Sequence, residues 1–275
     1  KEGDVTRGKI ALVENLAHLI IQDPEAVNEK LSRCLLCGGC QFSCPSGVPT
    51  LEIFMEARAI VTAYLGLSPV KKAIFRKLLP NLRAGSPFQK LLLKDEQNPQ
   101  KTACAPLLKS LFGDRHMPLL SDKPLRSKVG KVDRPAGKSG LRVAFFPGCM
   151  GDKIYTGVSE ACLKVFEHHG VGVFLSDNFA CCGIPALVSG DREGVEKMIE
   201  HNLGILSRTH FDYIVTPCSS CTMTIKEYWP EMSRNLPASV QETAKKFGAK
   251  AIDINAFLVD VLGVHPEGPA KGGLK

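Results

Sequence analysis

Apolar residues recur at helical spacing through the first third of the chain. In residues 8–22 and again in 51–65 they fall three or four positions apart, so each stretch presents one apolar face. A short helix is expected between the two, ahead of the first cysteines, and prolines divide residues 66–112 into further short helices. The first part of the chain is therefore predicted to be helical.

From residue 141 onward the hydrophobic period changes. Short runs of apolar and β-branched residues predict strands over 141–146, 171–175 and 213–216. Helical patterns fall between and after them, at about 158–169, 191–207, 220–228, 239–247 and 254–262. Strands that alternate with helices are typical of a parallel α/β sheet with right-handed crossovers.

The two patterns meet in a basic stretch with little periodicity. Residues 113–140 are rich in Gly, Pro, Lys and Ser, as expected of a linker between domains. The predicted fold class is therefore α+β overall. It consists of a helical domain at 1–112, a basic linker at 113–140 and an α/β parallel-sheet domain at 141–275.

The charge distribution adds one feature to this picture. The formal net charge is +7, yet residues 71–142 carry 17 Lys or Arg against 5 Asp or Glu, so the rest of the chain is acidic. This stretch is either a solvated connector or a docking surface for an acidic partner or an anionic membrane leaflet. In the second case residues 71–79 would form a basic amphipathic helix on the membrane. No aromatic residues alternate with these charges, so a nucleic-acid partner is not expected.

Composition indicates a globular chain rather than a membrane or secreted one. No apolar run approaches the roughly 20 residues that a spanning helix needs, and no signal peptide opens the sequence. An odd number of thiols, eleven, at metal-ligand spacing does not suit a secreted disulfide scaffold. Thiolate ligands persist in a reducing compartment, so a cytoplasmic location is expected.

Four of the cysteines form one tight run. Cys34, Cys37, Cys40 and Cys44 stand at x2, x2 and x3 spacing, and Pro45 follows. This is the bacterial ferredoxin spacing for a cubane iron–sulfur cluster, because a tight loop can wrap several corners of one cluster. Zinc also binds paired cysteines, but seldom in this arrangement. The run predicts a ferredoxin-type 4Fe–4S cluster.

The spacing of the run does not identify the fourth ligand of that cluster. In two-cluster ferredoxins the fourth cysteine of a run ligates the other cluster, and this chain holds a single run. Cys44 would then serve a cluster whose other ligands lie elsewhere. Cys104 is a candidate for the fourth position beside Cys34, Cys37 and Cys40.

Five further cysteines form a second group: Cys149, Cys181, Cys182, Cys218 and Cys221. They follow predicted strands, and the carboxyl ends of parallel strands are where such sheets bind ligands. Helix N-termini there present free N–H groups to an anionic cluster or thiolate. We therefore expect three separate chain segments to converge on one site, with one cysteine more than a single cubane or zinc site requires.

The chain resembles a known family at these residues. Residues 34–49, reading CLLCGGCQFSCPSGVP, resemble the second ferredoxin motif of the iron–sulfur subunits of glycolate oxidase and lactate dehydrogenase. Residues 6–10 resemble the segment that follows the first such motif. The second cysteine group resembles the cysteine-rich CCG domain, which those subunits share with the iron–sulfur subunit of anaerobic glycerol-3-phosphate dehydrogenase and with heterodisulfide reductase. The resemblance implies a helical ferredoxin-like domain followed by a CCG domain.

Two parts of the family pattern are missing from this sequence. Family members usually carry two ferredoxin motifs and two CCG domains, and one of each is present here. The sequence also begins without Met, and its last residues read like the approach to another strand. We therefore expect a fragment of a longer protein.

The resemblance also implies a cofactor for the second group. Its spacing of Cys-x31-Cys-Cys-x35-Cys-x2-Cys is close to that of the heterodisulfide reductase subunit that holds noncubane 4Fe–4S clusters. By that resemblance all five cysteines bind one noncubane 4Fe–4S cluster. A four-thiolate cubane or 2Fe–2S site, structural zinc, and a metal-free or redox-disulfide site are the alternatives.

The function that the resemblance implies is electron transfer within an oxidoreductase complex. An FAD-containing dehydrogenase on another chain would oxidise a 2-hydroxyacid, lactate or glycolate, and the two clusters would pass electrons to quinone or another carrier. A membrane or quinone-reducing subunit is a further expected partner, with the chain peripheral on the inner face of the membrane. One alternative is a heterodisulfide-reductase-like subunit that reduces a disulfide at the noncubane cluster. Another is an interaction module that holds structural zinc. No catalytic residue is predicted in this chain.

The remaining candidates are assigned structural roles. Cys162 lies on the apolar face of a helix and is expected to be a buried thiol. His168 and His169 end that helix, where a cation suits the helix dipole. Five polar residues are instead candidates for hydrogen bonds to cluster sulfurs: Asp152, Lys153 and Tyr155, which follow Cys149 closely, and Ser219 and Ser220, which lie between two cysteines.

Overall fold

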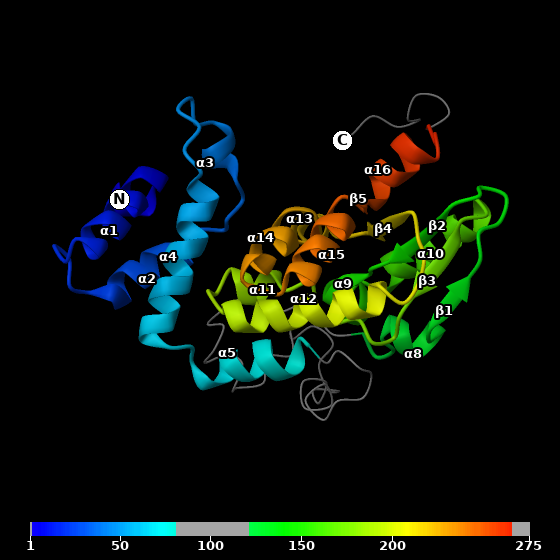
Figure 1. Cartoon of the computed structure of the whole chain (residues 1–275), viewed down its shortest axis with the longest axis horizontal. Coiled ribbons are helices and arrows are strands. Elements are labelled where there is room, and N and C mark those ends of the chain that lie inside the picture. The colour runs from blue at the N-terminus through cyan, green and yellow to red at the C-terminus, as the bar shows by residue number, and fades with distance from the viewer. Residues whose placement is uncertain (1, 81–120, 266–275) are drawn as a thin grey trace. The chain divides into compact units, whose positions relative to one another are not determined.

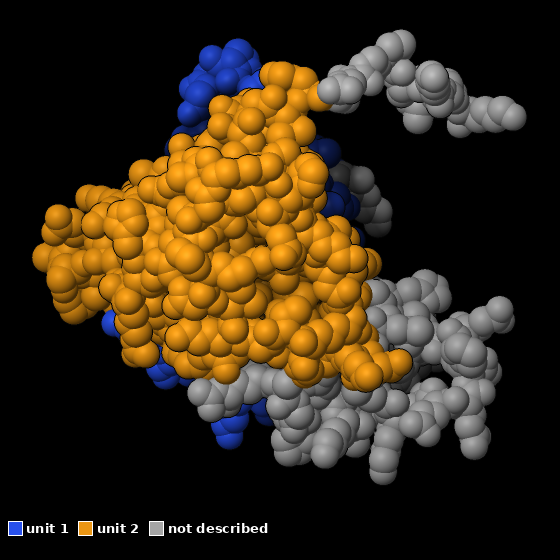
Figure 2. Space-filling view, turned by 90° about the vertical axis from the view of Figure 1, so that its right-hand side faces the viewer, with its two compact units in different colours: residues 1–81, 183–200 blue, residues 82–182, 201–275 orange. Residues whose placement is uncertain are grey.

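The computed structural model describes residues 2–80 and 121–265 and divides the chain into two compact units (Figure 2). Unit 1 comprises residues 1–81 and 183–200, and unit 2 comprises residues 82–182 and 201–275. The chain therefore passes from unit 2 to unit 1 directly after the paired cysteines and returns after residue 200. Each unit is described by itself.

Unit 1 is helical, as the apolar period predicts. Its elements are η1 (Glu2–Asp4), α1 (Thr6–Ala17), α2 (Pro24–Ser32), α3 (Gly39–Phe42), α4 (Thr50–Leu65), α5 (Pro69–Ala73), η2 (Ile74–Leu78), α11 (Ile184–Leu187) and the first part of α12 (Arg192–Leu206). Helix α2 begins where the Asp23 carboxylate accepts a hydrogen bond from the backbone N–H of Ala26. Helix α1 is shorter than the expected 8–22, because the backbone turns at Leu19, whose φ is +58°.

Unit 2 contains a five-stranded sheet in the order β1-β3-β2-β4-β5 (Figure 1). Its strands are β1 (Val132–Arg134), β2 (Arg142–Phe145), β3 (Gly172–Leu175), β4 (Tyr213–Thr216) and β5 (Ala251–Asp253). Its helices are α8 (Leu125–Val129), α9 (Gly148–Lys153), α10 (Thr156–His168), α13 (Ser219–Met223), η3 (Thr224–Tyr228), α14 (Trp229–Met232), η4 (Ser233–Asn235), α15 (Ala238–Gly248), α16 (Ile254–Ala256) and η5 (Phe257–Val261), with the last part of α12.

The sheet is parallel across four of its strands, and the predicted α+β fold class is confirmed. Strands β3, β2, β4 and β5 pair in parallel in that order. Strand β1 departs from the expectation, because it pairs antiparallel with β3 at the edge. Strands β1 and β5 have three residues each, too few to show a period.

The expected linker at 113–140 contains ordered elements where the structure describes it. Helix α8 and strand β1 both lie within that interval. The exposure of β1 alternates along its three residues, and short edge strands of this kind are rich in charge. The charged residues at 132–134 therefore belong to an edge strand and not to an unstructured connector. The predicted domain boundaries stay predictions.

The core of unit 2 is built from aromatic side chains between the sheet and its helices. Phe145 of β2 and Phe166 of α10 meet edge to face, with ring centroids 5.5 Å apart, and Phe166 meets Phe257 in the same way at 6.0 Å. Cys162 is 6% exposed beside this core, and burial raises the pKa of its thiol to about 11. The prediction of a buried structural thiol is confirmed.

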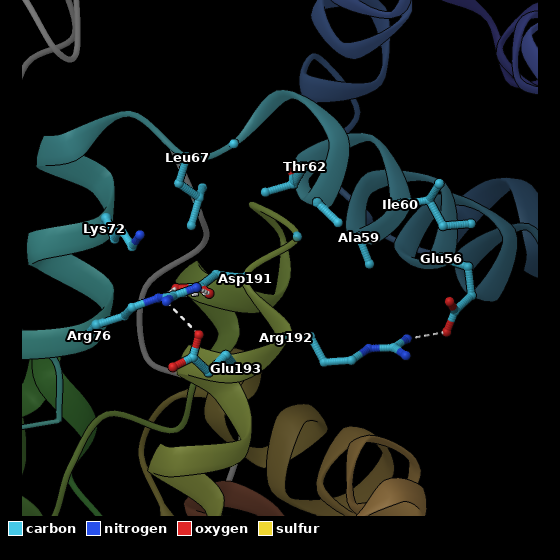
Figure 3. Close-up of a pocket in the computed structure, with 13 residues that line it drawn as sticks. Glu56, Ala59, Ile60, Thr62, Leu67, Lys72, Arg76, Asp191, Arg192 and Glu193 are labelled. Atoms are coloured by element: carbon cyan, nitrogen blue, oxygen red, sulfur yellow. Dashed lines mark hydrogen bonds and ion pairs between the residues drawn. The ribbon is translucent and has the colours of Figure 1, made fainter.

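Residues 184–193 belong to unit 1 and are held there by charged side chains (Figure 3). Arg76 of η2 donates to both carboxylate oxygens of Asp191 and also pairs with Glu193 at 2.5 Å. Arg192 pairs with Glu56 of α4 at 2.5 Å. These groups line a cavity of about 440 Å³ in unit 1. Ion pairs thus help to anchor the chain after the paired cysteines, beside buried apolar side chains such as Leu187.

Replacing Arg76 with methionine is expected to destabilise unit 1 by about 1.5–3 kcal/mol, the usual range for hydrogen bonds to a charged group. The Asp191 side chain is buried, so its carboxylate would lose its cationic partner without gaining water. Arg192→Met is the matched control, because the pair of Arg192 with Glu56 is exposed and is expected to contribute less than about 1 kcal/mol. Urea unfolding followed by circular dichroism measures both. Equal losses in the two variants would contradict the prediction.

Among the described residues no single helix has the length and apolar composition to span a membrane. Helix α4 and the α5–η2 helix, bent by 114° at their junction, meet the criterion only as a pair.

Candidate metal centre

The cysteines of the second group follow three strands that end at one edge of the sheet in unit 2. Strands β3, β2 and β4 are neighbours and run in the same direction. Cys149 lies in the first turn of α9 after β2, and Cys218 precedes the first residue of α13 after β4. Cys181 and Cys182 follow β3. The predicted placement at the carboxyl ends of parallel strands is therefore found.

Each of the five thiols of this group interacts with at least one other thiol of the group. The Sγ of Cys181 lies 3.8 Å from that of Cys149, and the Sγ of Cys221 lies 3.4 Å from that of Cys182. Cys181 also interacts with Cys182, and Cys218 with Cys221. The sulfur atoms thus form one connected set, which we call the five-thiol site.

The thiols of the five-thiol site differ in their pKa. The Cys181 thiol donates to Cys149, and this hydrogen bond, the one with Cys182 and burial raise the pKa of Cys181 well above its ordinary value. The hydrogen bonds of Cys221 with Cys182 and Cys218, and its burial, raise the pKa of Cys221 in the same way. The hydrogen bond with Cys221 lowers the pKa of Cys218 to about 6. One thiolate is therefore ready at neutral pH, and the buried thiols need a cation to release their protons.

Backbone and amide groups fix the loop that carries the paired cysteines. The indole Nε1–H of Trp229 donates to the carbonyl oxygen of Cys182 at 2.8 Å. The side chain of Asn202 accepts from the N–H of Ala180 at 2.9 Å and donates to the carbonyl of Cys181 at 3.0 Å. Each is a single polar residue far along the chain, so the sequence offered no signal for it.

A glycine makes room for the sulfur atoms. Gly148 has a φ of +67°, and a Cβ atom there would lie 2.8 Å from the Sγ of Cys221. Only glycine combines that backbone conformation with the absence of a side chain. The space beside Cys221 is thus kept free at the first residue of α9.

Replacing Gly148 with alanine is expected to displace Cys221 and to reduce metal binding at the five-thiol site severalfold. The positive φ adds about 1–2 kcal/mol of strain. Gly157→Ala is the matched control, because nothing lies within 4 Å of a Cβ at that helical position. Iron content after anaerobic reconstitution measures the effect, and full iron binding by Gly148→Ala would contradict the prediction.

Two buried charges and one half-buried charge lie next to this site. The Asp152 carboxylate accepts from the backbone N–H of Arg126 at 3.1 Å and lies 3.4 Å from its Nε and 3.2 Å from the Nζ of Lys153. The Arg126 guanidinium also donates to the carbonyls of Asp177 and Phe179. Burial lowers the pKa of Arg126, whereas Asp152, then Asp177 and Cys149, raise it. The Arg126 cation thus interacts with Cys149, and a positive charge in this position favours an anion at the five-thiol site.

The first cysteine run lies in unit 1 between α2 and α4. The thiol of Cys40 lies 3.1 Å from the hydroxyl of Thr50, the first residue of α4, and this hydrogen bond lowers the pKa of Cys40. The backbone N–H of Leu36 points to the Sγ of Cys34 at 3.5 Å, and Leu36 adopts a φ of +53°. Cys37 is exposed, and Cys34, Cys40 and Cys44 are half-buried.

The four sulfur atoms of this run share one loop, but the structure does not bring them into contact. Cys104, the candidate for a replacement ligand, lies outside the described residues. Among the residues that the structure describes, no group of three or more His, Cys, Asp or Glu side chains is close enough for a single metal ion. An iron–sulfur cluster spans a wider space than an ion, and thiol-only donor sets are those that clusters use. The cleared space at Gly148 and the Arg126 cation that interacts with Cys149 also suit a cluster.

The fold and the five-thiol site define a cysteine-rich domain on a parallel α/β sheet, and comparison with known proteins agrees. Residues 143–226 match the family described as "Cysteine-rich domain" (CCG). The chain therefore contains a CCG domain, as the resemblance predicted.

Two iron–sulfur relatives and a lactate utilization protein are similar to this chain. It is 28% identical over 276 residues to the "Probable glycolate oxidase iron-sulfur subunit" of Bacillus subtilis, which covers 93% of this chain and 61% of that protein. It is 33% identical over 132 residues to "Lactate utilization protein A" of an Exiguobacterium species, which covers 47% of this chain and 53% of that protein. It is 38% identical over 97 residues to an "Uncharacterized iron-sulfur protein" of Methanocaldococcus jannaschii, which covers 35% of this chain and 20% of that protein.

These relatives confirm the suspected resemblance to the glycolate oxidase and lactate utilization iron–sulfur proteins. The chain spans about three fifths or less of the length of each of these relatives. No solved structure matches it.

Proposed function

We propose that this chain is an iron–sulfur electron-transfer subunit of a 2-hydroxyacid dehydrogenase, for lactate or glycolate. The observation that carries the proposal is the convergence of five thiols from three strand ends on one site. The names of the similar proteins, an iron–sulfur subunit of glycolate oxidase and a lactate utilization protein, support the substrate class.

The residues that would hold the clusters are the nine cysteines of the two groups. Cys34, Cys37, Cys40 and Cys44 would bind a ferredoxin-type 4Fe–4S cluster in unit 1. Cys149, Cys181, Cys182, Cys218 and Cys221 would bind a noncubane 4Fe–4S cluster in unit 2. Bound clusters supply one-electron carriers, while the chain places the thiolates, buries them and sets the surrounding charge.

The protein would work with other chains. An FAD-containing dehydrogenase subunit would oxidise the substrate, and quinone or another carrier would take up the electrons. The chain would be cytoplasmic, with peripheral contact to the inner face of the membrane through a membrane or quinone-reducing subunit. The basic helix of α5 and η2, with Lys71, Lys72 and Lys77, supports contact with an anionic surface.

Metal analysis and spectroscopy test the proposal on anaerobically purified protein. Iron and acid-labile sulfide, with little zinc and an EPR signal that develops on reduction, are expected. After mixing with the flavoprotein subunit, lactate or glycolate should reduce the clusters. Zinc in place of iron would refute the proposal. Cluster oxidation by a disulfide, without any response to a hydroxyacid, would instead favour disulfide reduction at the same site.

A further inference from the structure

One arginine of unit 1 is buried beside the first cysteine run without a carboxylate. Arg58, in the middle of α4, is 4% exposed. Its guanidinium donates to the carbonyl oxygens of Cys34 at 2.5 Å and Val188 at 2.6 Å, and to that of Leu31. Its Nε is buried and has no hydrogen-bond partner. None of the salt bridges between described residues includes Arg58.

A cation in this position is costly to the protein without a ligand. Removing a charge from water costs several kcal/mol, and neutral carbonyl groups offset only part of that. Burial lowers the pKa of Arg58, and the electrostatic interaction with Cys34 raises it. A cluster held by thiolates is an anion, and it gains one further negative charge on reduction. The buried cation and the cysteine loop therefore have complementary charges.

Helix α4 directs two groups at the same loop. Thr50 at its first residue contacts the thiol of Cys40, where the positive end of the helix dipole also lies. Arg58 lies about two turns further along and holds the backbone at Cys34. The planar guanidinium reaches three carbonyls at once, which an ammonium group on a flexible stem does less well. The two contacts hold the cysteine run at Cys34 and at Cys40 against one helix.

We infer that Arg58 is a positioning residue that supplies the counter-charge of the cluster bound by Cys34, Cys37, Cys40 and Cys44 and thereby raises its reduction potential. The inference rests on the proposed function, since it requires a cluster in unit 1. It is independent of the substrate, the flavoprotein and the final electron acceptor. The residue acts on the redox equilibrium of the centre through charge and through the position of the loop.

A neighbouring arginine offers a matched control. Arg33 directly precedes Cys34 and carries the same charge, but its side chain is 55% exposed and pairs with Glu29 and Asp4. Water and salt screen such an exposed charge. If burial is what gives Arg58 its effect, neutralising Arg33 should change the redox equilibrium little.

The test compares Arg58→Gln, Arg58→Lys and Arg33→Gln in the full chain by EPR-monitored redox titration, with iron and sulfide analysis of each. The signal of this centre is the one that Cys40→Ser removes. Arg58→Gln is expected to shift the reduction equilibrium about tenfold toward the oxidised cluster, about 59 mV for a one-electron couple. Arg58→Lys and Arg33→Gln should remain within about threefold of the wild type, and the centre of unit 2 should not respond.

Stability without the cluster gives a second readout. Arg58→Gln removes an uncompensated cation from the cluster-free protein, so it should lower the urea midpoint less there than in the cluster-loaded protein. Loss of the centre in Arg58→Gln with its retention in Arg58→Lys would also support the inference, because it would show that the cluster requires a positive charge at this position. Three results would overturn it: an unchanged potential in Arg58→Gln with full iron content, equal shifts in Arg58→Gln and Arg33→Gln, or loss of the centre in both Arg58 variants. Absence of iron from this run in the wild type would instead refute the proposed function.

Discussion

Replacing Asp152 with alanine is expected to lower the free energy of unfolding of unit 2 by about 3–5 kcal/mol, the cost of breaking a buried ion pair. The Asp152 side chain is fully buried, and its Oδ2 lies near the side chains of both Arg126 and Lys153, while its Oδ1 accepts from the backbone N–H of Arg126. Without the carboxylate, two cations share one buried site and repel each other. Urea unfolding followed by the fluorescence of Trp229, the single tryptophan and a buried residue of this unit, measures the loss.

A pH series gives this prediction a direction as well as a size. Burial already holds the pKa of Lys153 below its ordinary value of 10.5, and Asp152 counters that shift. In folded Asp152→Ala the pKa of Lys153 falls further. At pH values between this lowered pKa and the pKa of Lys153 in the unfolded chain, the unfolded chain binds more protons than the folded one. Stability then rises with pH through that window. The loss caused by Asp152→Ala should therefore be smaller at about pH 9 than at about pH 7.

Two further variants show whether the effect comes from buried charge. Asp133→Ala removes a carboxylate from an exposed pair with Arg142 and is expected to cost less than about 1 kcal/mol. Adding Lys153→Met to Asp152→Ala removes one orphaned cation and should recover part of the loss. A loss below about 1 kcal/mol in Asp152→Ala, or no recovery in the double variant, would contradict the role assigned to the three charges.

Much of the fold could be predicted from the sequence where an element was long enough to show a period. The expected helix at 51–65 corresponds to α4, and that at 239–247 to α15. The strand expected at 213–216 is β4. Three-residue strands such as β1 and β5 pair through backbone groups that every residue carries, so their side chains left no pattern to recognise.

The packing of residues 183–200 could not be predicted in this way. They follow the paired cysteines of the CCG domain, yet they belong to the compact unit of the ferredoxin-like helices. The contacts that hold them there, such as that of Arg76 with Asp191, join residues 115 positions apart. Charge pairs at such separations have no local signature in a single sequence.

In the candidate site, too, the residues with a local sequence pattern could be predicted and the others could not. Cysteine spacing and strand ends predicted that Cys149, Cys182 and Cys221 converge, because thiol ligands are few and their spacing is specific. The supporting residues were missed or left unassigned. Arg58 and Arg126 are ordinary arginines in the sequence, and only burial without a full complement of carboxylates distinguishes them.

Replacing Cys182 with serine is expected to remove the whole cluster of the five-thiol site, about four irons per chain. Cys182 lies in the middle of the connected thiols, 3.4 Å from Cys221 and beside Cys181. A serine hydroxyl is a harder donor and stays protonated at neutral pH, so it does not replace a thiolate ligand. Iron and sulfide analysis with EPR on anaerobically purified protein measures the loss, and the signal of the first cysteine run should persist.

Cys162→Ser is the matched control for that loss. Cys162 is also buried in unit 2, and its raised pKa keeps it a neutral thiol. Both variants place a hydroxyl in a buried position, with a cost of about 1–3 kcal/mol. They differ in that Cys162 has no part in the proposed ligand set. Equal iron loss in the two variants would mean that the cluster depends on general stability of unit 2, and full iron in Cys182→Ser would remove that residue from the ligands. Loss confined to Cys182→Ser would tie the metal to the connected thiols themselves.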